Sequence, residues 1–260
     1  MLYYRYHKQT DTGEIIQFAC RADNYGYLLA DRRSGRAVAI DTPDPLMVIA
    51  LLEQKGWHLT YILNTHWHDD HVGGNVMLKE ATGARVIAPE AERKRIPGID
   101  VGIRDGAVII LGDLTIHAME TAGHTLGSLS YYVPKVDAVF SGDALFTMGC
   151  GRLFEGTPEM AWNGLLKLAA LPAETRIYCA HEYGLANATF ALSLDYHNDQ
   201  EFSARAEAIQ MRQNSPTVPS TIGLERRTNP FFSIPIKKSH IKEQVELYSI
   251  LRDQKNNFGL

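Results

Sequence analysis

The chain has 260 residues, of which 45% are hydrophobic and 22% are charged, and its formal net charge is −4. This composition is typical of a globular protein, and the sequence has no run of roughly 18 apolar residues that would span a membrane. The slight excess of acidic residues gives no general attraction to nucleic acid or to anionic lipid, so we expect a partner of neither kind.

The cysteines and the N-terminal segment both bear on where the protein works. Cys20, Cys150 and Cys179 are an odd number at wide spacing, which favours reduced thiols over a disulfide framework. The first residues, MLYYRYHKQTDTGEII, lack the basic segment, the apolar stretch and the cleavage site of a secretory signal. We therefore expect a cytoplasmic protein, and we expect it to be a monomer.

Short strand-like segments dominate the first two thirds of the chain. They are residues 13–19, 25–30, 36–40, 59–64, 84–88, 107–111, 114–119, 128–133, 137–142 and 175–180. Helical patterns interrupt them at residues 44–56, 73–83 and 158–172. In the first of these, Asp44 and Pro45 favour a helix start and Gly56 favours a helix end. Many strands with a few helices between them predict sheets covered by helices, which is an α/β architecture.

After Cys179 the pattern changes from strands to helices. Residues 185–216 read as two helices that join near residues 197–199, followed by a connector rich in Pro, Ser and Thr. A last helix should begin at Ser239, because serine is a favoured capping residue. The sequence thus divides into a mixed domain, residues 1–183, and a small helical domain, residues 184–260.

The segment ILNTHWHDDHVGG, residues 62–74, places three histidines and two aspartates within six positions after an apolar strand. His66 and His68 are two positions apart, so they can converge from an extended backbone, whereas Asp70 and His71 point elsewhere as the chain bends. Neutral imidazoles and carboxylates are the usual ligands of zinc, iron and manganese. The spacing therefore predicts two neighbouring metal ions, one on each pair of residues.

A pair of metal ions needs more ligands than one loop supplies, and three further candidates follow apolar strands elsewhere in the chain. We divide the candidates between two ions that share one carboxylate: His66, His68 and His124 on the first ion, Asp70, His71 and His181 on the second, and Asp143 between them. One such histidine would more often be structural, but seven candidates at four strand ends argue against that reading. Asp69 is expected to face solvent or to support a ligand.

These residues make the chain resemble the metallo-β-lactamase superfamily, whose motif THxHxDH stands here at residues 65–71. Within that superfamily the chain resembles glyoxalase II, the hydroxyacylglutathione hydrolases, over nearly its full length. The resemblance also rests on AGHTLG at 122–127, SGDALF at 141–146, GCGRLFEGT at 149–157, HEY at 181–183 and TNPFF at 228–232. THxHxDH identifies the superfamily only, whereas GCGRLFEGT, HEY and the helical C-terminus indicate which family within it the chain resembles.

The resemblance implies an αββα sandwich with a C-terminal α-helical domain that helps to bind glutathione. The implied substrate is a small-molecule glutathione thioester, chiefly S-D-lactoylglutathione, which is hydrolysed to D-lactate and glutathione as the second step of methylglyoxal detoxification. The implied cofactors are two divalent metal ions per chain. Zinc is our first choice, and iron or manganese would accept the same ligands.

The glutathione contacts of the family carry over in part. Arg152 matches a basic position near the metals, and Tyr183 matches a tyrosine that contacts the peptide. Phe154 stands where some members have tyrosine, so a hydroxyl contact is absent. Many members have an arginine after NPF, where this chain has Ser233. The contacts that the resemblance implies here are Arg152, Tyr183, Phe154, Lys237 and Lys238.

The implied chemistry is hydrolysis without a serine or cysteine nucleophile. Two cations that share a water would lower its pKa toward neutrality, and the resulting bridging hydroxide would attack the thioester carbonyl. A metal ion would stabilise the oxyanion while the glutathione thiolate leaves. We assign the catalytic carboxylates to Asp70, which steadies the hydroxide, and to Asp143, which bridges the ions. Cys150 and Cys179 are expected to pack in the interior.

Other functions fit parts of the sequence. A lactonase or a β-lactamase would share the ligands but would not account for GCGRLFEGT and Tyr183. A glutathione persulfide dioxygenase would hold one iron on two histidines and a carboxylate, which leaves Asp70, His71 and His181 without a role. A non-catalytic protein on this fold should have lost ligands, and an RNA-processing enzyme finds no support in the net charge or in a basic run. Trp67 either lines the pocket or packs beneath the loop.

Overall fold

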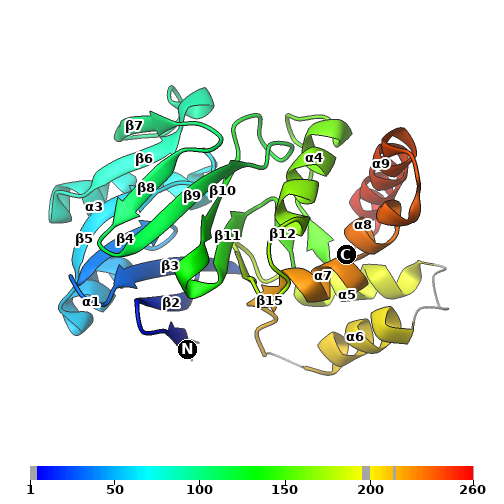
Figure 1. Ribbon diagram of the computed structural model, residues 1–260, viewed down its shortest axis with the longest axis horizontal. Helices are drawn as coiled ribbons and strands as arrows, with labels where there is room; N and C mark the ends of the chain where they lie inside the picture. The colour runs from blue at the N-terminus through cyan, green and yellow to red at the C-terminus, as the bar shows by residue number, and fades with distance from the viewer. Residues whose placement is uncertain (1–4, 195–199, 213–214, 260) are drawn as a thin grey trace.

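The computed structural model describes residues 5–194, 200–212 and 215–259, in which two β-sheets pack face to face (Figure 1). The first sheet contains, in spatial order, β1 (Arg5–Gln9), β2 (Gly13–Cys20), β3 (Asn24–Asp31), β4 (Arg36–Ile40), β5 (His58–Leu63), β6 (Arg85–Pro89) and β7 (Ile99–Ile103). The second contains β15 (Ser220–Thr221), β14 (Arg176–Cys179), β11 (Ala138–Gly142), β10 (Leu129–Val133), β9 (Leu114–Glu120) and β8 (Val108–Leu111). A separate short hairpin joins β12 (Leu145–Phe146) to β13 (Gly149–Cys150).

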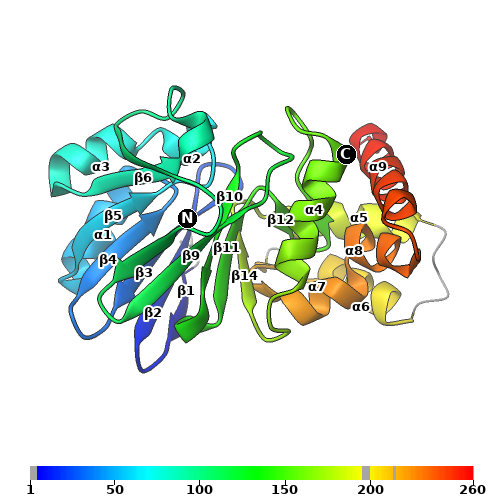
Figure 2. The ribbon, with the colours of Figure 1, turned by 45° about the horizontal axis from the view of Figure 1, so that its top comes forward.

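Three apolar layers hold the sheets and helices together. Leu29 and Val38 of the first sheet pack against Ile116 and Phe140 of the second, in a core without solvent access. A second layer joins the outer face of the first sheet to α1 (Pro45–Lys55) and α3 (Asn75–Thr82). A third joins the outer face of the second sheet to α4 (Pro158–Ala169) and to the C-terminal helices. The order helix, sheet, sheet, helix, which Figure 2 shows from another side, confirms the predicted αββα sandwich.

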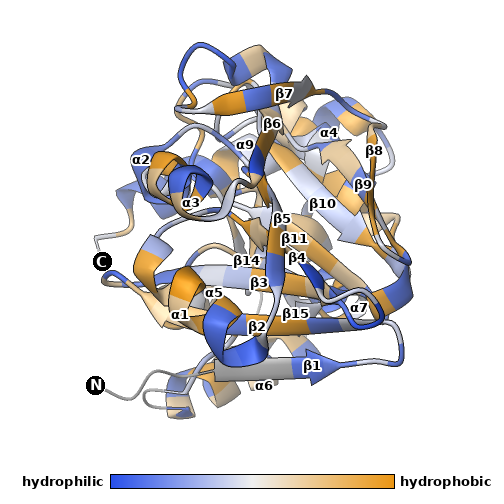
Figure 3. Cartoon of the chain, turned by 90° about the vertical axis from the view of Figure 1, so that its left-hand side faces the viewer, coloured by the Kyte–Doolittle hydropathy of each residue, from blue (hydrophilic) through white to orange (hydrophobic). Residues whose placement is uncertain are grey.

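Local sequence signals fix the ends of several elements. The Asp44 side chain accepts a hydrogen bond from the Met47 amide at 3.0 Å, Pro45 stands in the first turn, and Gly56 ends α1 with a left-handed φ of 65°. The predicted start and end of this helix are therefore confirmed. Figure 3 shows hydrophobic residues along the strands and largely hydrophilic residues in the outer loops, as the alternating patterns require. Within the described residues, no helix is both long and apolar enough to cross a bilayer.

The C-terminal region is helical, as predicted, but its details differ from the prediction. It contains α5 (Gly184–Ser193), α6 (Gln200–Met211), α7 (Ile222–Thr228), α8 (Pro230–Ser233), the 3-10 turn η3 (Pro235–Lys237) and α9 (Ile241–Asn257). The predicted junction at residues 197–199 lies outside the described residues. The prediction that the last helix begins at Ser239 was wrong: its N-cap is His240, which makes no side-chain capping bond, so packing rather than capping sets this helix start.

The connector expected before TNPFF instead adds structure to the second sheet. Its β15 pairs antiparallel with β14, so Thr221 lies opposite Arg176. In α7, which follows β15, Glu225 has no solvent exposure and pairs with Arg205, whose side chain is 9% exposed. Glu225 also accepts hydrogen bonds at 2.9 Å from the Met148 amide and from the Asn229 side chain. Glu225 thus ties three segments of the chain together at the turn that precedes GCGR.

We expect Glu225→Ala to lower the free energy of unfolding by ~3–5 kcal/mol, because it leaves the Arg205 guanidinium buried without its counter-ion. Chemical denaturation would measure the change, with the same slope of unfolding free energy against denaturant concentration in the natural protein and the variant. The matched control is Glu201→Ala, which removes an exposed ion pair with Arg227 and should cost under about 1 kcal/mol. Equal losses in the two variants would contradict the proposed importance of the buried pair.

Candidate metal centre

The strand ends that carry the predicted ligands meet at one edge of the sandwich. His66 follows β5, and α2 (Asp69–Val72) continues the same loop. Asp143 follows β11, and His181 follows β14, a parallel neighbour of β11, so the two reach the same edge. His124 lies in the loop between β9 and β10, where its carbonyl accepts a hydrogen bond from the Phe154 amide and the Gly123 carbonyl accepts one from the Gly156 amide. The structure therefore brings all seven predicted ligands together from four separate segments.

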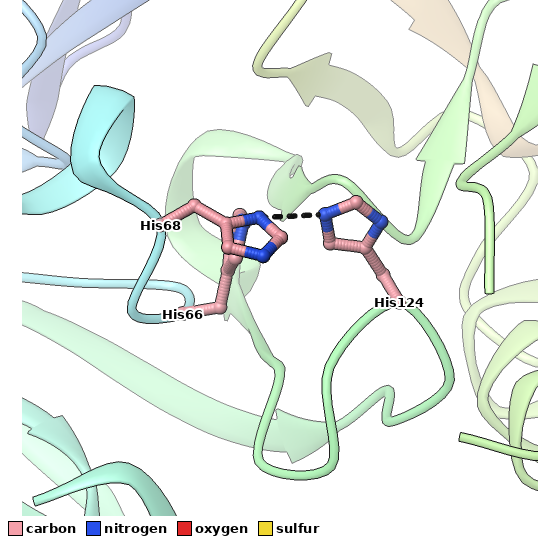
Figure 4. A group of neighbouring side chains, drawn as sticks. All are labelled: His66, His68 and His124. Carbon is pink, nitrogen blue, oxygen red and sulfur yellow. Dashed lines mark hydrogen bonds between the residues drawn. The ribbon is translucent and has the colours of Figure 1, made fainter. Parts of the chain in front are cut away.

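Three histidines converge on one point, as Figure 4 shows. His68 Nδ1 lies 2.9 Å from His66 Nε2 and 3.0 Å from His124 Nε2. A single ring nitrogen carries at most one proton, so it cannot donate to both neighbours at once. Three imidazole nitrogens that face a common point are the arrangement expected of ligands to one cation.

A second group of donors lies next to the first. The Oδ2 atom of Asp70 is 3.4 Å from His71 Nε2 and 3.3 Å from His181 Nε2. Asp143 stands between the two groups: its Oδ1 is 3.5 Å from Nε2 of both His71 and His181, and its Oδ2 is 3.3 Å from His124 Nε2. The two oxygens of one carboxylate thus face different groups.

Unpaired polar atoms indicate that these residues suit metal ions. His71 Nε2 and Asp143 Oδ1 are buried and have no hydrogen-bond partner among the described residues. Burying such atoms unpaired costs free energy, and divalent cations at the centre of the two groups would satisfy both. The donor set of imidazoles and carboxylates is also the one that zinc, iron and manganese accept.

The other ring nitrogens of the histidines have partners that fix their orientation. Nδ1 of His71 lies 2.8 Å from Asp41 Oδ2, Nδ1 of His181 lies 2.9 Å from Asp23 Oδ1, and Nδ1 of His124 lies 2.8 Å from the Arg152 carbonyl. Carboxylates and carbonyls only accept hydrogen bonds, so each Nδ1 carries a proton and each Nε2 points to the centre.

Sequence analysis missed the two supporting aspartates. Asp41 follows the apolar strand β4, as Asp143 follows β11, so the rule that found Asp143 would also have found Asp41. Asp41 also accepts hydrogen bonds at 2.8 Å from the backbone and the hydroxyl of Thr65, which anchors the start of THxHxDH. Asp23 lies in the turn between β2 and β3, and nothing local links it to His181.

The pKa shifts of the histidines differ in direction between the two groups. Burial lowers the pKa of His66, His68 and His124, which therefore stay neutral at neutral pH and suit metal coordination. Burial also acts on His71, but Asp41 and Asp143 outweigh it and raise its pKa well above the usual value. The carboxylates of Asp143 and Asp70, which lie 3.5 and 3.3 Å from His181 Nε2, likewise outweigh burial and raise the pKa of His181 to about 10.

The carboxyl groups respond in the opposite direction. Burial alone would raise the pKa of Asp70 and Asp143, but contacts with His71 and His181 outweigh it, so both pKa values lie far below the usual range. The two aspartates are ionised at neutral pH, and protons on His71 and His181 balance their charge. A divalent cation would replace those protons as the source of positive charge.

Three of the predicted glutathione contacts surround the histidines. The Tyr183 ring stacks on His181 with centroids 4.8 Å apart, and the Phe154 ring meets His124 edge-on at 5.1 Å. Phe154 is 60% exposed, and the guanidinium of Arg152 lies 6.0 Å from its ring centre. These side chains form an open rim beside the centre.

The other residues of the predicted glutathione site lie in the C-terminal region. Lys237 and Lys238 are exposed in and just after η3. Ser233 is buried at the end of α8, so a ligand outside the protein would not reach its hydroxyl. The structure therefore offers no exposed group at the position of Ser233.

The remaining residues of the motifs have structural surroundings. The half-buried Trp67 ring packs against the Arg95 guanidinium at 3.4 Å and donates to Glu155 at 3.1 Å, so it supports the loop as well as bordering His68. The side chain of Asp69 is 90% exposed and faces solvent. Cys150 and Cys179 are buried, and burial raises the pKa of both thiols.

Comparison with known proteins agrees with this geometry. The pattern of the metallo-beta-lactamase superfamily matches residues 32–181, and that of the hydroxyacylglutathione hydrolase C-terminus matches residues 182–258. The hydroxyacylglutathione hydrolase of Maricaulis maris is 46% identical over 252 residues, covering 94% of this chain and 98% of the relative. That of Mesorhizobium japonicum is 46% identical over 253 residues, covering 94% and 99%.

Solved structures share the fold. ETHE1 from Myxococcus xanthus is 25% identical, with a TM-score of 0.65 over 96% of this chain and 91% of that one. TTHA1623 in a di-iron-bound form is 28% identical, with a TM-score of 0.57 over 80% and 94%. The chain therefore belongs to the metallo-β-lactamase superfamily and, within it, to the hydroxyacylglutathione hydrolase family.

Replacing Asp41 with Asn should weaken metal binding by about 10- to 100-fold, because the amide no longer holds the Nδ1 proton of His71 as a carboxylate does. Metal content after dialysis against a chelator would measure the loss. The exposed neighbour Asp69 supplies the control, and Asp69→Asn should retain metal like the natural protein. Full retention of metal by Asp41→Asn would contradict a supporting role for this carboxylate.

Proposed function

We propose that the protein is a binuclear metal-dependent thioesterase that hydrolyses S-D-lactoylglutathione to D-lactate and glutathione. The observation that carries the proposal is the pair of donor groups that share Asp143, in a chain of the hydroxyacylglutathione hydrolase family. The relatives are hydroxyacylglutathione hydrolases, a name that describes this reaction class, and the di-iron form of TTHA1623 supports a two-metal site on this fold.

The first metal ion would be held by His66, His68 and His124, and the second by Asp70, His71 and His181, with Asp143 shared. Zinc is the proposed metal, and iron or manganese fits the same donors. When bound, two divalent cations supply Lewis acidity toward the thioester carbonyl and make water acidic enough to react at neutral pH.

The protein's own side chains orient this centre. Asp41 and Asp23 hold the Nδ1 protons of His71 and His181, so that both Nε2 atoms face inward. The Asn24 amide donates to Asp70 Oδ2 at 2.9 Å and fixes that catalytic carboxylate. These contacts place the donors before the substrate arrives, which limits the reorganisation needed during the reaction.

The rim residues would bind the glutathione half of the substrate. Arg152 offers a positive charge for a carboxylate of the peptide, and Lys237 and Lys238 offer further charges from the C-terminal region. Burial, together with Asp23 and Asp143, raises the pKa of Tyr183, so its phenol keeps a proton and can donate a hydrogen bond. Phe154 adds an exposed apolar surface.

The division of labour follows the two parts of the chain. We assign the chemistry to residues 1–183, and we assign the binding of glutathione to residues 184–260 together with the rim residues Arg152, Phe154 and Tyr183. A single-iron dioxygenase would have no use for the second donor group, which the structure keeps complete. We further propose that the enzyme acts in the cytoplasm as a monomer on a small-molecule substrate, without nucleic acid or membrane partners. The three buried free cysteines and the net charge of −4 support this setting.

Purified protein should remove the thioester absorbance of S-D-lactoylglutathione and carry close to two metal ions per chain. His66→Ala and Asp143→Ala should abolish the reaction while the circular dichroism spectrum stays unchanged, because each removes a ligand and neither side chain builds the core. Normal turnover by a metal-depleted Asp143→Ala protein would exclude the proposed mechanism. A protein loaded with two metals that leaves the thioester intact would exclude the proposed substrate.

Arg152→Ala should raise KM by about tenfold, the value of one charge-assisted hydrogen bond, with little change in kcat. The reason is that the guanidinium binds substrate and takes no part in the attack. Steady-state kinetics on S-D-lactoylglutathione would test this, with Arg33→Ala in the exposed turn between β3 and β4 as the control. A large fall in kcat at constant KM would show that Arg152 acts on the chemistry instead.

A further inference from the structure

We propose that Glu92 is a positioning residue: it fixes the loop that carries His124, and thereby sets the affinity of the three-histidine group for its metal ion. The inference rests on the metal centre in the proposed function and not on the thioesterase reaction. Glu92 is not one of the seven ligands, and it stands in a different segment of the chain.

Glu92 makes its main contacts with the His124 loop. It ends the 3-10 turn η1 (Glu90–Glu92) after β6, and only 2% of it is exposed. Its Oε1 accepts hydrogen bonds from the Thr125 hydroxyl and, at 3.0 Å, from the Gly127 amide. Thr125 directly follows His124, so the Glu92 carboxyl binds the loop on the C-terminal side of this ligand.

The position of the His124 loop sets the geometry of the three-histidine group. His124 Nε2 lies 3.0 Å from His68 Nδ1, and the first metal ion would be bound by ligands from the His124 loop and from the loop of His66 and His68. Any change in the separation of the two loops would therefore change the fit.

Hydrogen bonds within the loop connect the residues that Glu92 contacts with the residues beside His124. The Gly123 amide donates to the Thr125 carbonyl at 2.9 Å, and the hydroxyls of Thr125 and Ser128 lie 2.6 Å apart. A Cβ atom on Gly127 would lie 2.6 Å from Cγ of Glu92, so glycine at this position permits the close approach. The conformation of the AGHTLG segment therefore accommodates Glu92 as well as the ligand His124.

A carboxyl at this place is costly for folding. Burial raises the pKa of Glu92, the nearby Glu155 raises it further, and no lysine or arginine pairs with its carboxyl in the described part of the chain. Its Oε2 atom is buried without a hydrogen-bond partner among the same residues. An apolar side chain would fill the space at lower cost, so the contacts with the His124 loop are the reason to place an acid here.

Titration of metal-free protein with Zn²⁺, in competition with a chromophoric chelator, tests the proposal. The natural protein should bind two ions. In Glu92→Ala the dissociation constant of one ion should rise by about 10- to 100-fold while that of the other is unchanged, as expected when a residue that supports ligands is lost. Glu92→Gln keeps an acceptor oxygen and should restore most of the affinity.

The control is Glu90→Ala, in the same short turn, where the carboxylate pairs with Arg93 instead of the His124 loop. It should bind both ions like the natural protein. Loss of both ions to the same extent in Glu92→Ala, or no loss at all, would overturn the proposal, because a general loss of stability does not distinguish the two donor groups.

Double variants locate the affected ion. In a His181→Ala background, which keeps the three-histidine group, Glu92→Ala should weaken the remaining ion. In a His68→Ala background it should have no effect, and an effect confined to that background would refute the assignment. If Glu92→Ala does not fold, Thr125→Val removes only the hydroxyl and should weaken the same ion. Because the titration reads binding alone, a protein that binds both ions without hydrolysing the thioester contradicts the proposed function and leaves this inference standing.

Discussion

The mutual neutralisation of acids and imidazoles at one edge of the sandwich is the interaction on which the site depends. Asp143 is buried and Asp70 is half-buried, yet both are ionised, because His71 and His181 supply positive charge. Such groups would repel or remain unpaired if any one segment were displaced. The point at which each of these strands ends therefore matters to the site as much as the way the strand packs.

Support for the ligands comes from elements far away in the sequence. Asp23 reaches His181 from a turn in the first sheet, and Glu182, the next residue, accepts a hydrogen bond from Tyr25 at 2.7 Å and another from the Thr217 amide at 2.7 Å. The HEY segment thus links the first sheet, the metal centre and the C-terminal region. Its glutamate has a structural purpose between a ligand and a rim residue, which explains why the three occur consecutively.

The sequence predicted more of the site than of the fold that supports it. Histidines and aspartates at the ends of apolar strands can be recognised locally, and so can the cap and the end of α1. The strands β1 and β7 were missed. RYHKQ lacks the alternation that marks a strand, whereas IDVGI alternates over five residues only, and both strands are fixed by pairing with neighbours. Asp23 and Glu92 were missed for the same reason: their partners are brought near only by the tertiary fold.

The pairing of β15 with β14 limits how the C-terminal region can move or be removed. Because residues 220–221 complete the edge of the second sheet, the helices beyond residue 184 are not an appendage on a flexible hinge. A fragment that stops near residue 184 would leave β14 as an open edge next to His181, available for pairing with other chains. The C-terminal region is therefore coupled to the sheet that carries His181, and exchange of this region between relatives requires a matching edge strand.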